Sequence, residues 1–274
     1  MHRAEPSSRA YYLFANCGAM ASLVRDKVAG HWAVRSHTCK HRCCQPCRRR
    51  VASIVRYNLA EKCNEVVRRA GRNGLKAVTL TLKHSAANLR DQLRRLLTSF
   101  RTLRRRKRLK HFFKGGAYVI EIKVSSKDGL WHPHLHILTE GNFTRVETLS
   151  DEWNAVTKDS EVVWIKAVPD VQMAVAHDTK YITKAVDNSV YTNERKLAEF
   201  VTATKGIRMV GTFGTWRGVK LNRRVPSNAD WQFFVPLHHA IMAAERGDIA
   251  MIDALAWLQS KFTPDVPTLA QPPP

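Results

Sequence analysis

Residues 131–138 read Trp131-His132-Pro133-His134-Leu135-His136-Ile137-Leu138, and this stretch decides how the centre of the chain folds. Side chains alternate between the two faces of a β-strand, so the three histidines share one face while Leu135 and Ile137 point to the other. A strand with one apolar face and three imidazoles on the opposite face is suited to binding a metal ion. The sequence therefore predicts a core strand that also carries a metal site.

Two neighbouring segments alternate in the same way. Residues 76–83 place three aliphatic side chains on one face, which predicts a half-buried strand. A second strand is expected over residues 117–125, and Lys127-Asp128-Gly129 supplies a turn from it into the histidine strand. These two strands should form an antiparallel hairpin, in which Glu121 lies on the same face as the histidines.

Helical patterns separate and follow the strands. Apolar residues recur at three- and four-residue spacing from Leu89 to Leu103, and Ser85 is the expected N-cap of this helix. Another helix is expected over residues 146–157, then a strand over residues 162–168 and a further helix directly after it. The order is β-α-β-β-α-β-α, followed by a mostly helical part with one strand-like stretch over residues 206–221.

The composition indicates a globular protein that binds a polyanion. Hydrophobic residues make up 44% of the 274 residues, which is enough for a core. Lys and Arg number 45 against 23 Asp and Glu, and the net charge of +22 favours nucleic acid as the partner. The sequence holds no run of about 18 apolar residues and does not begin like a signal peptide, so we expect a cytoplasmic protein with no membrane partner.

Two basic runs are candidates for contact with DNA phosphates. One follows the cysteines and the other follows the helix that ends near Leu103, where a solvated basic surface is the alternative. The candidate DNA-binding residues are Arg48, Arg49, Arg50, Arg104, Arg105, Arg106, Lys107 and Arg108. The part of the chain from Pro226 onward is mildly acidic, and its role stays open.

The cysteines predict a structural metal site near the start of the chain. The candidate ligands of a zinc ion are Cys17, Cys39, Cys44 and Cys47. Their spacing suits tetrahedral zinc, and the residues between them are too polar for a core segment. Cys43 could substitute for its neighbour, and His37 or His41 could replace the first cysteine. Cys63 lies in a helical pattern and should pack in the core.

A second metal site is expected on the histidine strand. It combines His134 and His136 with a third ligand, either Glu121 or His132. Two imidazoles and one carboxylate leave coordination positions open, which a catalytic metal requires. An ion at this site could polarise a phosphate group.

A helix after the last core strand carries a candidate nucleophile. His177, Tyr181 and Lys184 fall at positions i, i+4 and i+7 and therefore on one helix face, and Asp178 lies one turn before the tyrosine. A tyrosine hydroxyl can attack phosphorus when a base and a cation are near. The alternative is an ordinary amphipathic surface pair of tyrosine and lysine.

Taken together, these motifs resemble the HUH endonucleases, and most of all the plasmid rolling-circle replication initiators. His134-Leu135-His136-Ile137-Leu138 fits the family's pattern of two histidines separated and followed by hydrophobic residues. Lys180-Tyr181-Ile182-Thr183-Lys184 fits the Tyr-x-x-Lys motif. Cys39-x2-Arg42-x-Cys44-x2-Cys47 resembles the cysteine-rich segment of one branch, and Thr79-Leu80-Thr81 resembles the first strand motif. The order and spacing of all four motifs agree.

The resemblance implies an α+β fold with a central five-stranded antiparallel sheet, similar to an RNA-recognition motif, and helices on one face. It also implies a small N-terminal zinc-binding module and a helical C-terminal part. The expected domains are a cysteine-rich basic module over residues 1–72, a nickase domain over 73–190, a mostly helical extension over 191–262 and a disordered proline-rich tail over 263–274.

The implied activity is sequence-specific nicking and joining of single-stranded or extruded DNA at a plasmid or phage origin. Tyr181 would form a 5′-phosphotyrosine and release a 3′-hydroxyl for a host DNA polymerase, aided by a host helicase. His134, His136 and Glu121 would hold Mg²⁺ or Mn²⁺, and Lys184 would help neutralise the phosphate. Whether the protein acts as a dimer stays open.

One position departs from the family pattern, because His177 stands where related initiators carry a glutamate four residues before the tyrosine. His177, Asp178 or the second tyrosine, Tyr191, could take part in termination. Two alternative functions remain at this point. One is a transposase of the same superfamily, which commonly uses paired tyrosines. The other is a non-catalytic, zinc-dependent DNA-binding regulator in which the histidines hold a structural ion.

Overall fold

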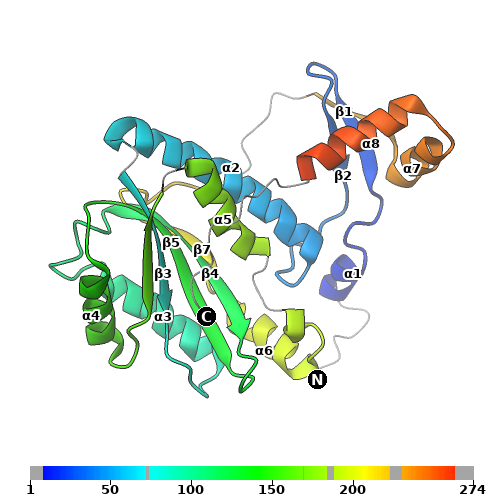
Figure 1. The fold of residues 1–274 in the computed structure, drawn as a ribbon. Coiled ribbons are helices and arrows are strands. Elements are labelled where there is room, and N and C mark those ends of the chain that lie inside the picture. Colours follow the sequence, from blue (N-terminus) through cyan, green and yellow to red (C-terminus); the bar gives the residue numbers. More distant parts are fainter. Residues whose placement is uncertain (1–8, 72–73, 169, 184–187, 223–229, 263–274) are drawn as a thin grey trace. The chain divides into compact units, whose positions relative to one another are not determined.

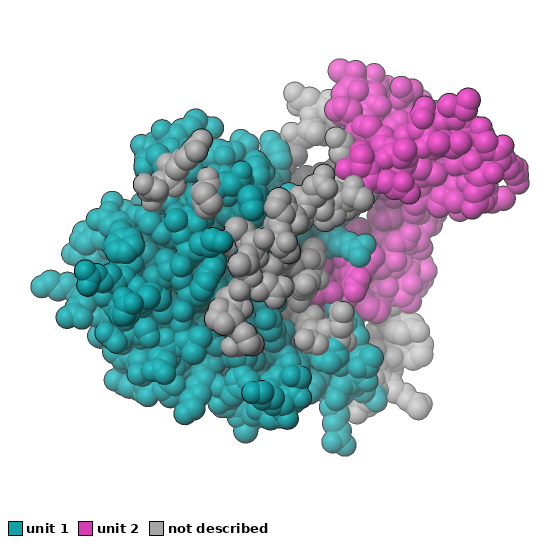
Figure 2. Space-filling model, viewed as in Figure 1, with its two compact units in different colours: residues 1, 49–223, 267–274 teal, residues 2–48, 224–266 magenta. Residues whose placement is uncertain are grey.

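The computed structural model describes residues 9–71, 74–168, 170–183, 188–222 and 230–262, with the backbone alone at residues 9–11, 178–183, 188 and 261–262. The described residues form two compact units (Figure 2). Unit 1 comprises the described residues within 49–223, and unit 2 those within 2–48 and 224–266. This division does not coincide with the expected domain boundaries, because the C-terminal helices join the N-terminal module. None of the helices in the described part is both long and apolar enough to span a membrane.

Unit 1 is built around the expected five-stranded antiparallel sheet. Its strands are β3 (Leu75–Thr81), β4 (Gly115–Val124), β5 (Trp131–Glu140), β6 (Val163–Ala167) and β7 (Val210–Gly214). They pair in the order β6-β3-β5-β4-β7, and every pairing is antiparallel. The sequence order β-α-β-β-α-β-α is therefore confirmed, and the glycine-bearing stretch supplies the fifth strand at one edge.

Helices pack on both faces of this sheet. The helical elements of unit 1 are α2 (Gln45–Ala70), α3 (Leu89–Leu103), α4 (Val146–Thr157), α5 (Val171–Thr183), η2 (Asn188–Val190) and α6 (Glu194–Thr204). We expected helices on one face, and α3 and α4 provide that layer, whereas α2 and α5 cover the opposite face (Figure 1). The helix α3 begins later than expected, because Asn88 rather than Ser85 accepts the N-cap hydrogen bond, from the amide of Asp91.

The two faces of the sheet differ in chemistry because neighbouring residues of each strand point in opposite directions. On β4, Tyr118 faces α3, where its ring lies 6.0 Å from that of Phe100. The next residue, Val119, belongs to the core under α2 and α5 together with Leu138 and Val175. This second face is the one that carries the histidines of β5, so α5 lies over them.

Unit 2 combines both ends of the chain. Its elements are α1 (Arg9–Ala15), β1 (Ser22–Asp26), β2 (Trp32–Arg35), β8 (Trp231–Pro236), α7 (Leu237–Glu245) and α8 (Ile249–Phe262). The strands form a sheet in the order β2-β1-β8. Leu23 of β1 packs with Ala240, Met251 and Ala254 of the two helices, and all four side chains are buried. The strand β8 was not expected, because its pairing with β1 spans most of the sequence.

Candidate functional site

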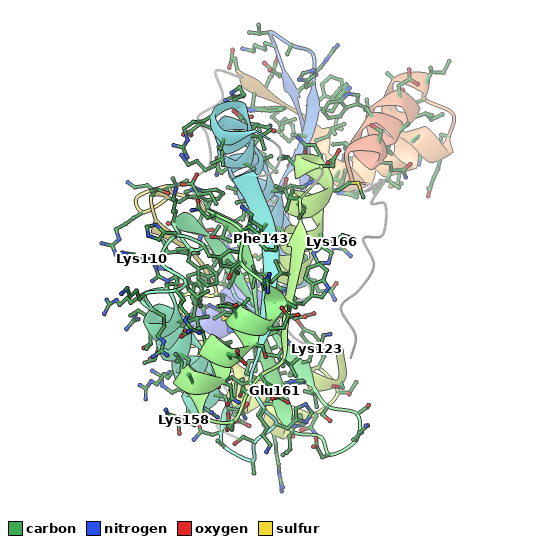
Figure 3. All side chains as sticks on the ribbon, turned by 60° about the vertical axis from the view of Figure 1, so that its left-hand side comes forward. Lys110, Lys123, Phe143, Lys158, Glu161 and Lys166 are labelled. Atoms are coloured by element: carbon green, nitrogen blue, oxygen red, sulfur yellow. The ribbon has the colours of Figure 1, made fainter. Side chains whose placement is uncertain are left out.

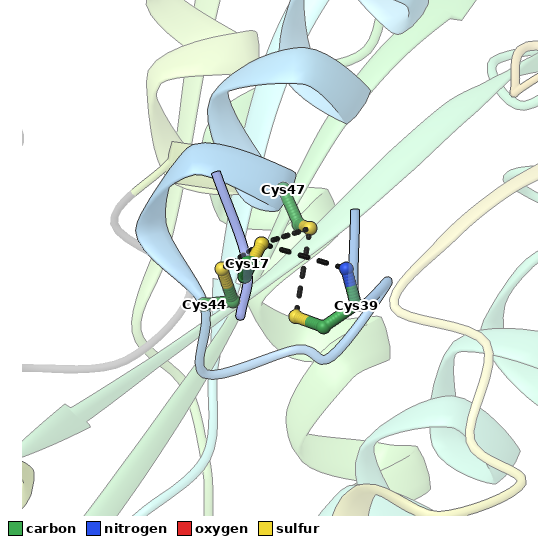
Figure 4. A group of neighbouring side chains, drawn as sticks. All are labelled: Cys17, Cys39, Cys44 and Cys47. Atoms are coloured by element: carbon green, nitrogen blue, oxygen red, sulfur yellow. Dashed lines mark hydrogen bonds between the residues drawn. The ribbon is translucent and has the colours of Figure 1, made fainter. Parts of the chain in front are cut away.

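Four cysteines of unit 2 form a compact cluster of thiols (Figure 4). The sulfur atoms of Cys17 and Cys44 are 3.2 Å apart, those of Cys17 and Cys47 are 3.5 Å apart, and those of Cys39 and Cys47 are 3.7 Å apart. Four sulfurs at about 2.3 Å around a tetrahedral zinc ion would be separated by about 3.8 Å. The four ligands named from the spacing alone are therefore brought together in an arrangement that fits zinc.

Backbone amides donate hydrogen bonds to sulfur atoms of the cluster, although burial raises the pKa of Cys39 and of Cys44. The amide of Cys39 donates to the sulfur of Cys17 at 3.4 Å, and the amide of Lys40 donates to the sulfur of Cys47 at 3.2 Å. Burial raises the pKa of Cys17, but the hydrogen bonds from Cys39 and from the neighbouring thiols outweigh it and lower this pKa to about 7. A thiol with a lowered pKa releases its proton more easily to a metal ion.

The remaining cysteines stay outside the cluster. Cys43 is buried, and its sulfur atom is not among the four that lie within 4.8 Å of one another. His41 accepts a hydrogen bond from the amide of Cys43 and does not replace a cysteine in the group. Cys63 is 1% exposed within α2 and packs in the core of unit 1, as the helical pattern indicated.

The second candidate site lies on the sheet face beneath α5. Register places His136 of β5 opposite Thr79 of β3, and His134 opposite Thr81. On the other side of β5, Glu121 of β4 is paired with His134. The expected hairpin therefore forms in the register that puts Glu121 among the histidines.

Threonine hydroxyls hold the two imidazoles in place. The Nδ1 atom of His136 lies 3.2 Å from Oγ1 of Thr79, and Nδ1 of His134 lies 3.0 Å from Oγ1 of Thr81. A hydroxyl that accepts the Nδ1 proton leaves the Nε2 lone pair of the ring available as a ligand. Among the described residues, Nε2 of His134 is buried and has no hydrogen-bond partner.

Glu121 completes this donor set. Its carboxylate is buried, and Oε2 lies 3.1 Å from Nε2 of His136 and 3.9 Å from Nζ of Lys123. Two neutral imidazoles and a carboxylate suit a divalent cation. The rings of His134 and His136 are 6.3 Å apart, however, and within the described part of the chain only the cysteines place three or more ligand atoms within 4.8 Å of one another. The candidate ligand atoms of the histidine site are thus spaced more widely than the sulfur atoms of the cysteine cluster.

The environment of the histidines favours their uncharged form. Burial, followed by the neighbouring His132 and His136, lowers the pKa of His134 to about 2. Burial and the neighbouring His84 lower the pKa of His132 to about 4. A neutral imidazole is the form that binds a metal ion, so these rings are ready to act as ligands near neutral pH.

His132, the first histidine of the strand, contacts His84 rather than Glu121. Its Nδ1 atom lies 2.8 Å from Nε2 of His84, whose own Nδ1 atom is 3.4 Å from Oδ2 of Asp128. The third ligand was left open between Glu121 and His132, and the contact with His136 favours Glu121. His84 has no motif around it, and only the fold reveals its pairing with the histidine strand.

The helix α5 brings further expected residues over this face. His177 is buried, and its ring centroid lies 6.5 Å from that of His136. The backbones of Asp178 and Tyr181 belong to the same helix, but their side chains lie outside the described residues, and so does the whole of Lys184. Tyr191 follows η2 in a turn.

The residues of the two basic runs differ in burial and in ion pairing. Arg49 and Arg50 are exposed on α2, whereas Arg48 is 6% exposed and therefore does not present its side chain at the surface. In the second run, Arg106 and Arg108 both approach the carboxylate of Glu152, and Arg105 and Lys107 are exposed without an ion pair to a described residue. Lysines from several elements add positive charge to the surface of unit 1, namely Lys110, Lys123, Lys158 and Lys166 (Figure 3).

Sequence reasoning missed the roles of Thr79 and Thr81 as hydrogen-bond partners of the histidines. Both threonines alternate along β3 on the face opposite its aliphatic residues, so their orientation was readable. Their contact with His134 and His136 depends on β3 pairing with β5 across α3 and β4, and a single sequence does not give that register.

Comparison with known proteins gives a consistent result. A family described as "Replication protein" matches residues 32–232 of the chain. A "Protein rep" of Lactiplantibacillus plantarum is 29% identical over 206 residues, which cover 66% of this chain and 65% of the relative. A "Protein rep" of a Bacillus species is 24% identical, covering 64% of this chain and 58% of the relative. A third, from Staphylococcus aureus, is 24% identical and covers 56% and 72%.

The match is partial in length. The chain spans 65% and 58% of the first two of these relatives, so their remaining parts have no counterpart in the alignment. No solved structure matches the chain at a significant level.

Proposed function

Since this chain belongs to the family of replication proteins, we propose that it initiates rolling-circle replication by nicking one strand of origin DNA through a tyrosine. Family membership favours replication over transposition. The observation that carries the proposed chemistry is the placement of α5 over the histidine face, where His177 approaches His136 at 6.5 Å. Position 181 lies four residues after His177 in the same helix, which supports the proposal that Tyr181 acts beside the candidate cation site.

Tyr181 is the proposed nucleophile. Its hydroxyl oxygen attacks the scissile phosphorus and loses its proton to a base, while the bond from phosphorus to the 3′-oxygen breaks. The product is a 5′-phosphotyrosine, and the departing 3′-oxygen takes up a proton to become the hydroxyl that a host polymerase extends. Lys184, one turn after the tyrosine in sequence, is proposed to neutralise the charge on the phosphate.

A divalent cation fits the site next to this helix. His134, His136 and Glu121 would hold Mg²⁺ or Mn²⁺, and the ion would polarise the phosphate and offset the charge that develops on it. Thr79 and Thr81 orient the two imidazoles through hydrogen bonds at their Nδ1 atoms. His177 is buried beside His136 and could accept a proton during termination, a role for which Asp178 and Tyr191 remain the alternatives.

The zinc site and the basic residues have separate proposed roles. A zinc ion on Cys17, Cys39, Cys44 and Cys47 would stabilise unit 2, whose own core is small. The exposed Arg49, Arg50, Arg105 and Lys107 are proposed to contact phosphates of the origin DNA. A host helicase and polymerase are the partners that the proposed reaction requires.

The nucleophile can be tested directly with labelled single-stranded DNA from the flanks of the gene. Wild-type protein, Tyr181→Phe and the matched control Tyr191→Phe are incubated with this DNA and Mn²⁺ and then run on a denaturing gel. We expect label to migrate with the wild-type protein and the control but not with Tyr181→Phe. DNA affinity should change by no more than a few-fold, because only a hydroxyl group is removed.

The outcomes discriminate between the proposed functions. An adduct that persists in Tyr181→Phe and disappears in Tyr191→Phe would overturn the assignment of the nucleophile. Tight binding without any adduct, across fragments that tile both flanks, would favour the DNA-binding regulator. A wild-type adduct that forms equally well after all divalent cations are chelated would remove the metal from the mechanism.

A further inference from the structure

Five arginines gather at the β7 edge of unit 1, on the sheet face opposite the histidines. We call Arg101, Arg104, Arg105, Arg208 and Arg217 the arginine cluster. The first three come from the end of α3 and the residues after it, and the other two flank β7. Tyr118 of β4 lies among them, because it faces α3 and is paired with Gly211 of β7.

Arg104 is the centre of the arginine cluster. Its guanidinium lies 5.1 Å from the ring centroid of Phe100 and 4.7 Å from that of Phe213. Burial lowers the pKa of Arg104, and the positive charges of Arg105, Arg217 and Arg101 lower it further. Burial raises the pKa of the Tyr118 hydroxyl, and the positive charges of Arg208, Arg104 and Arg101 oppose this rise. The fold places these residues at one edge, because Arg104 lies over Phe213 of β7, Arg208 directly precedes Met209, whose carbonyl oxygen accepts from the amide of Ile120, and the amide of Arg217 donates to the carbonyl oxygen of Gly214 at the end of β7.

No acidic group in the described part of the chain compensates this charge. None of the five arginines forms an ion pair with a described carboxylate, and among the described residues Nε of Arg104 is buried without a hydrogen-bond partner. The next arginines along the chain behave differently, since Arg106 lies 2.5 Å and Arg108 lies 3.8 Å from the carboxylate of Glu152. Like charges repel at short range, so the arginine cluster would be stabilised by an anion.

The form of the arginine cluster indicates which anion it fits. Several guanidinium groups spread over α3 and both ends of β7 match a row of phosphates better than a single small ion. The aromatic rings beneath Arg104 are only 2% and 3% exposed, so they are not available for stacking with unpaired bases. Tyr118 is half-buried, so the accessible surface here is made mainly of guanidinium groups, which is typical of contact with a duplex backbone.

We propose that the arginine cluster binds the phosphate backbone of duplex DNA that flanks the nicked strand. The inference rests on the proposed function for the identity of that DNA. Tyr118 and Glu121 occupy opposite faces of β4, so the duplex would lie on the other side of the sheet from the strand that meets the histidines. The protein would thus hold two segments of the origin at once.

The test compares two pairs of substitutions that remove the same charge. Arg208→Gln with Arg217→Gln removes two exposed members of the arginine cluster, and Arg106→Gln with Arg108→Gln removes two arginines that face Glu152. Binding of a blunt duplex oligonucleotide of arbitrary sequence is measured by fluorescence anisotropy over a series of salt concentrations. Formation of the covalent adduct on a short single-stranded origin fragment is measured in parallel.

We expect the first pair to reduce the slope of log K against log salt by about 1.8, because each lost phosphate contact contributes about 0.9. This corresponds to a loss of duplex affinity of about thirtyfold at about 0.15 M salt. The control pair should leave the slope nearly unchanged, and both pairs should form the adduct on the short fragment as wild type does.

An equal loss of slope in both pairs would overturn the proposal, because it would mean that only the overall charge matters. An unchanged slope in the first pair would overturn it as well. If the slopes separate as expected but wild-type protein forms no adduct, the arginine cluster stands as a duplex-binding surface while the proposed nicking function fails.

Discussion

The hydroxyl of Thr81 offers a test of how the fold prepares the histidine site. It lies 3.0 Å from Nδ1 of His134, and no other hydrogen bond holds this ring among the described residues. Replacing Thr81 with valine keeps the shape of the side chain and removes the hydroxyl. The ring then loses the hydrogen bond at Nδ1 that fixes its orientation.

Two free-energy changes should follow from Thr81→Val. Leaving a buried ring nitrogen without a partner costs about 1–3 kcal/mol of folding stability. Loss of an outer-shell hydrogen bond to a metal ligand typically lowers metal affinity about 10- to 100-fold, or about 1.4–2.7 kcal/mol. The second change can be measured separately because it concerns the folded protein alone.

The assay is titration of Mn²⁺ into zinc-loaded protein by isothermal calorimetry, together with thermal unfolding in the absence of Mn²⁺. Thr157→Val is the matched control, because the buried hydroxyl of Thr157 donates to the carbonyl oxygen of Trp153 at 2.8 Å, in α4. It should lose stability and keep its affinity for Mn²⁺. Thr81→Ser should restore most of the affinity. Our reasoning is refuted if Thr81→Val binds Mn²⁺ within about twofold of wild type while Thr81→Ser behaves no differently.

Three further predictions concern other parts of the molecule. Cys47→Ser should abolish stoichiometric zinc binding and lower the thermal stability of unit 2, whereas Cys63→Ser should retain the zinc. Metal analysis measures the bound zinc and calorimetry measures the stability. A zinc-loaded Cys47→Ser protein would contradict the assignment of the ligands. In metal-free protein the pKa of His132 is about 4 in the folded state and near 6.5 in the unfolded state, so the unfolded state takes up the proton first as pH falls. The free energy of unfolding should therefore fall as pH drops from about 6.5 to 4. His132→Gln should flatten this fall in urea titrations, and the same pH dependence in variant and wild type would contradict the prediction. Gly116→Ala should lower the free energy of unfolding by about 1–3 kcal/mol or more, because its Cβ would overlap the backbone carbonyl oxygen of Leu138. Gly129→Ala strains only a positive φ and should lower it less, as measured by urea unfolding. The reverse order of the two variants would contradict the packing.

Local patterns were sufficient to predict much of this structure. Alternation placed His134, His136 and Glu121 on one face because the side-chain period of a strand is fixed and a short turn joins β4 to β5. The four cysteines were found by spacing, since three of them lie within nine residues and their ligand chemistry is specific. These features need no knowledge of distant contacts.

Long-range contacts set the limit of sequence reasoning. The pairing of β1 with β8, the contact of His84 with His132 and the hydrogen bonds from Thr79 and Thr81 all join segments that are distant in the chain. The basic run after α3 looked uniform in sequence, yet Arg106 and Arg108 approach the carboxylate of Glu152 of α4 and Arg105 does not, although all three side chains are exposed. Such divisions arise from packing between elements.

The construction of unit 2 from both ends of the chain has a consequence for biosynthesis. The ribosome delivers the cysteines and the strands β1 and β2 first, but β8, α7 and α8 emerge only after the whole of unit 1. Until then Leu23 has no core to enter, and β1 has an open edge that could pair with another nascent chain. Early capture of zinc by the nascent segment would keep it compact during this interval, so the metal supply during translation should influence how much of the protein reaches the native state.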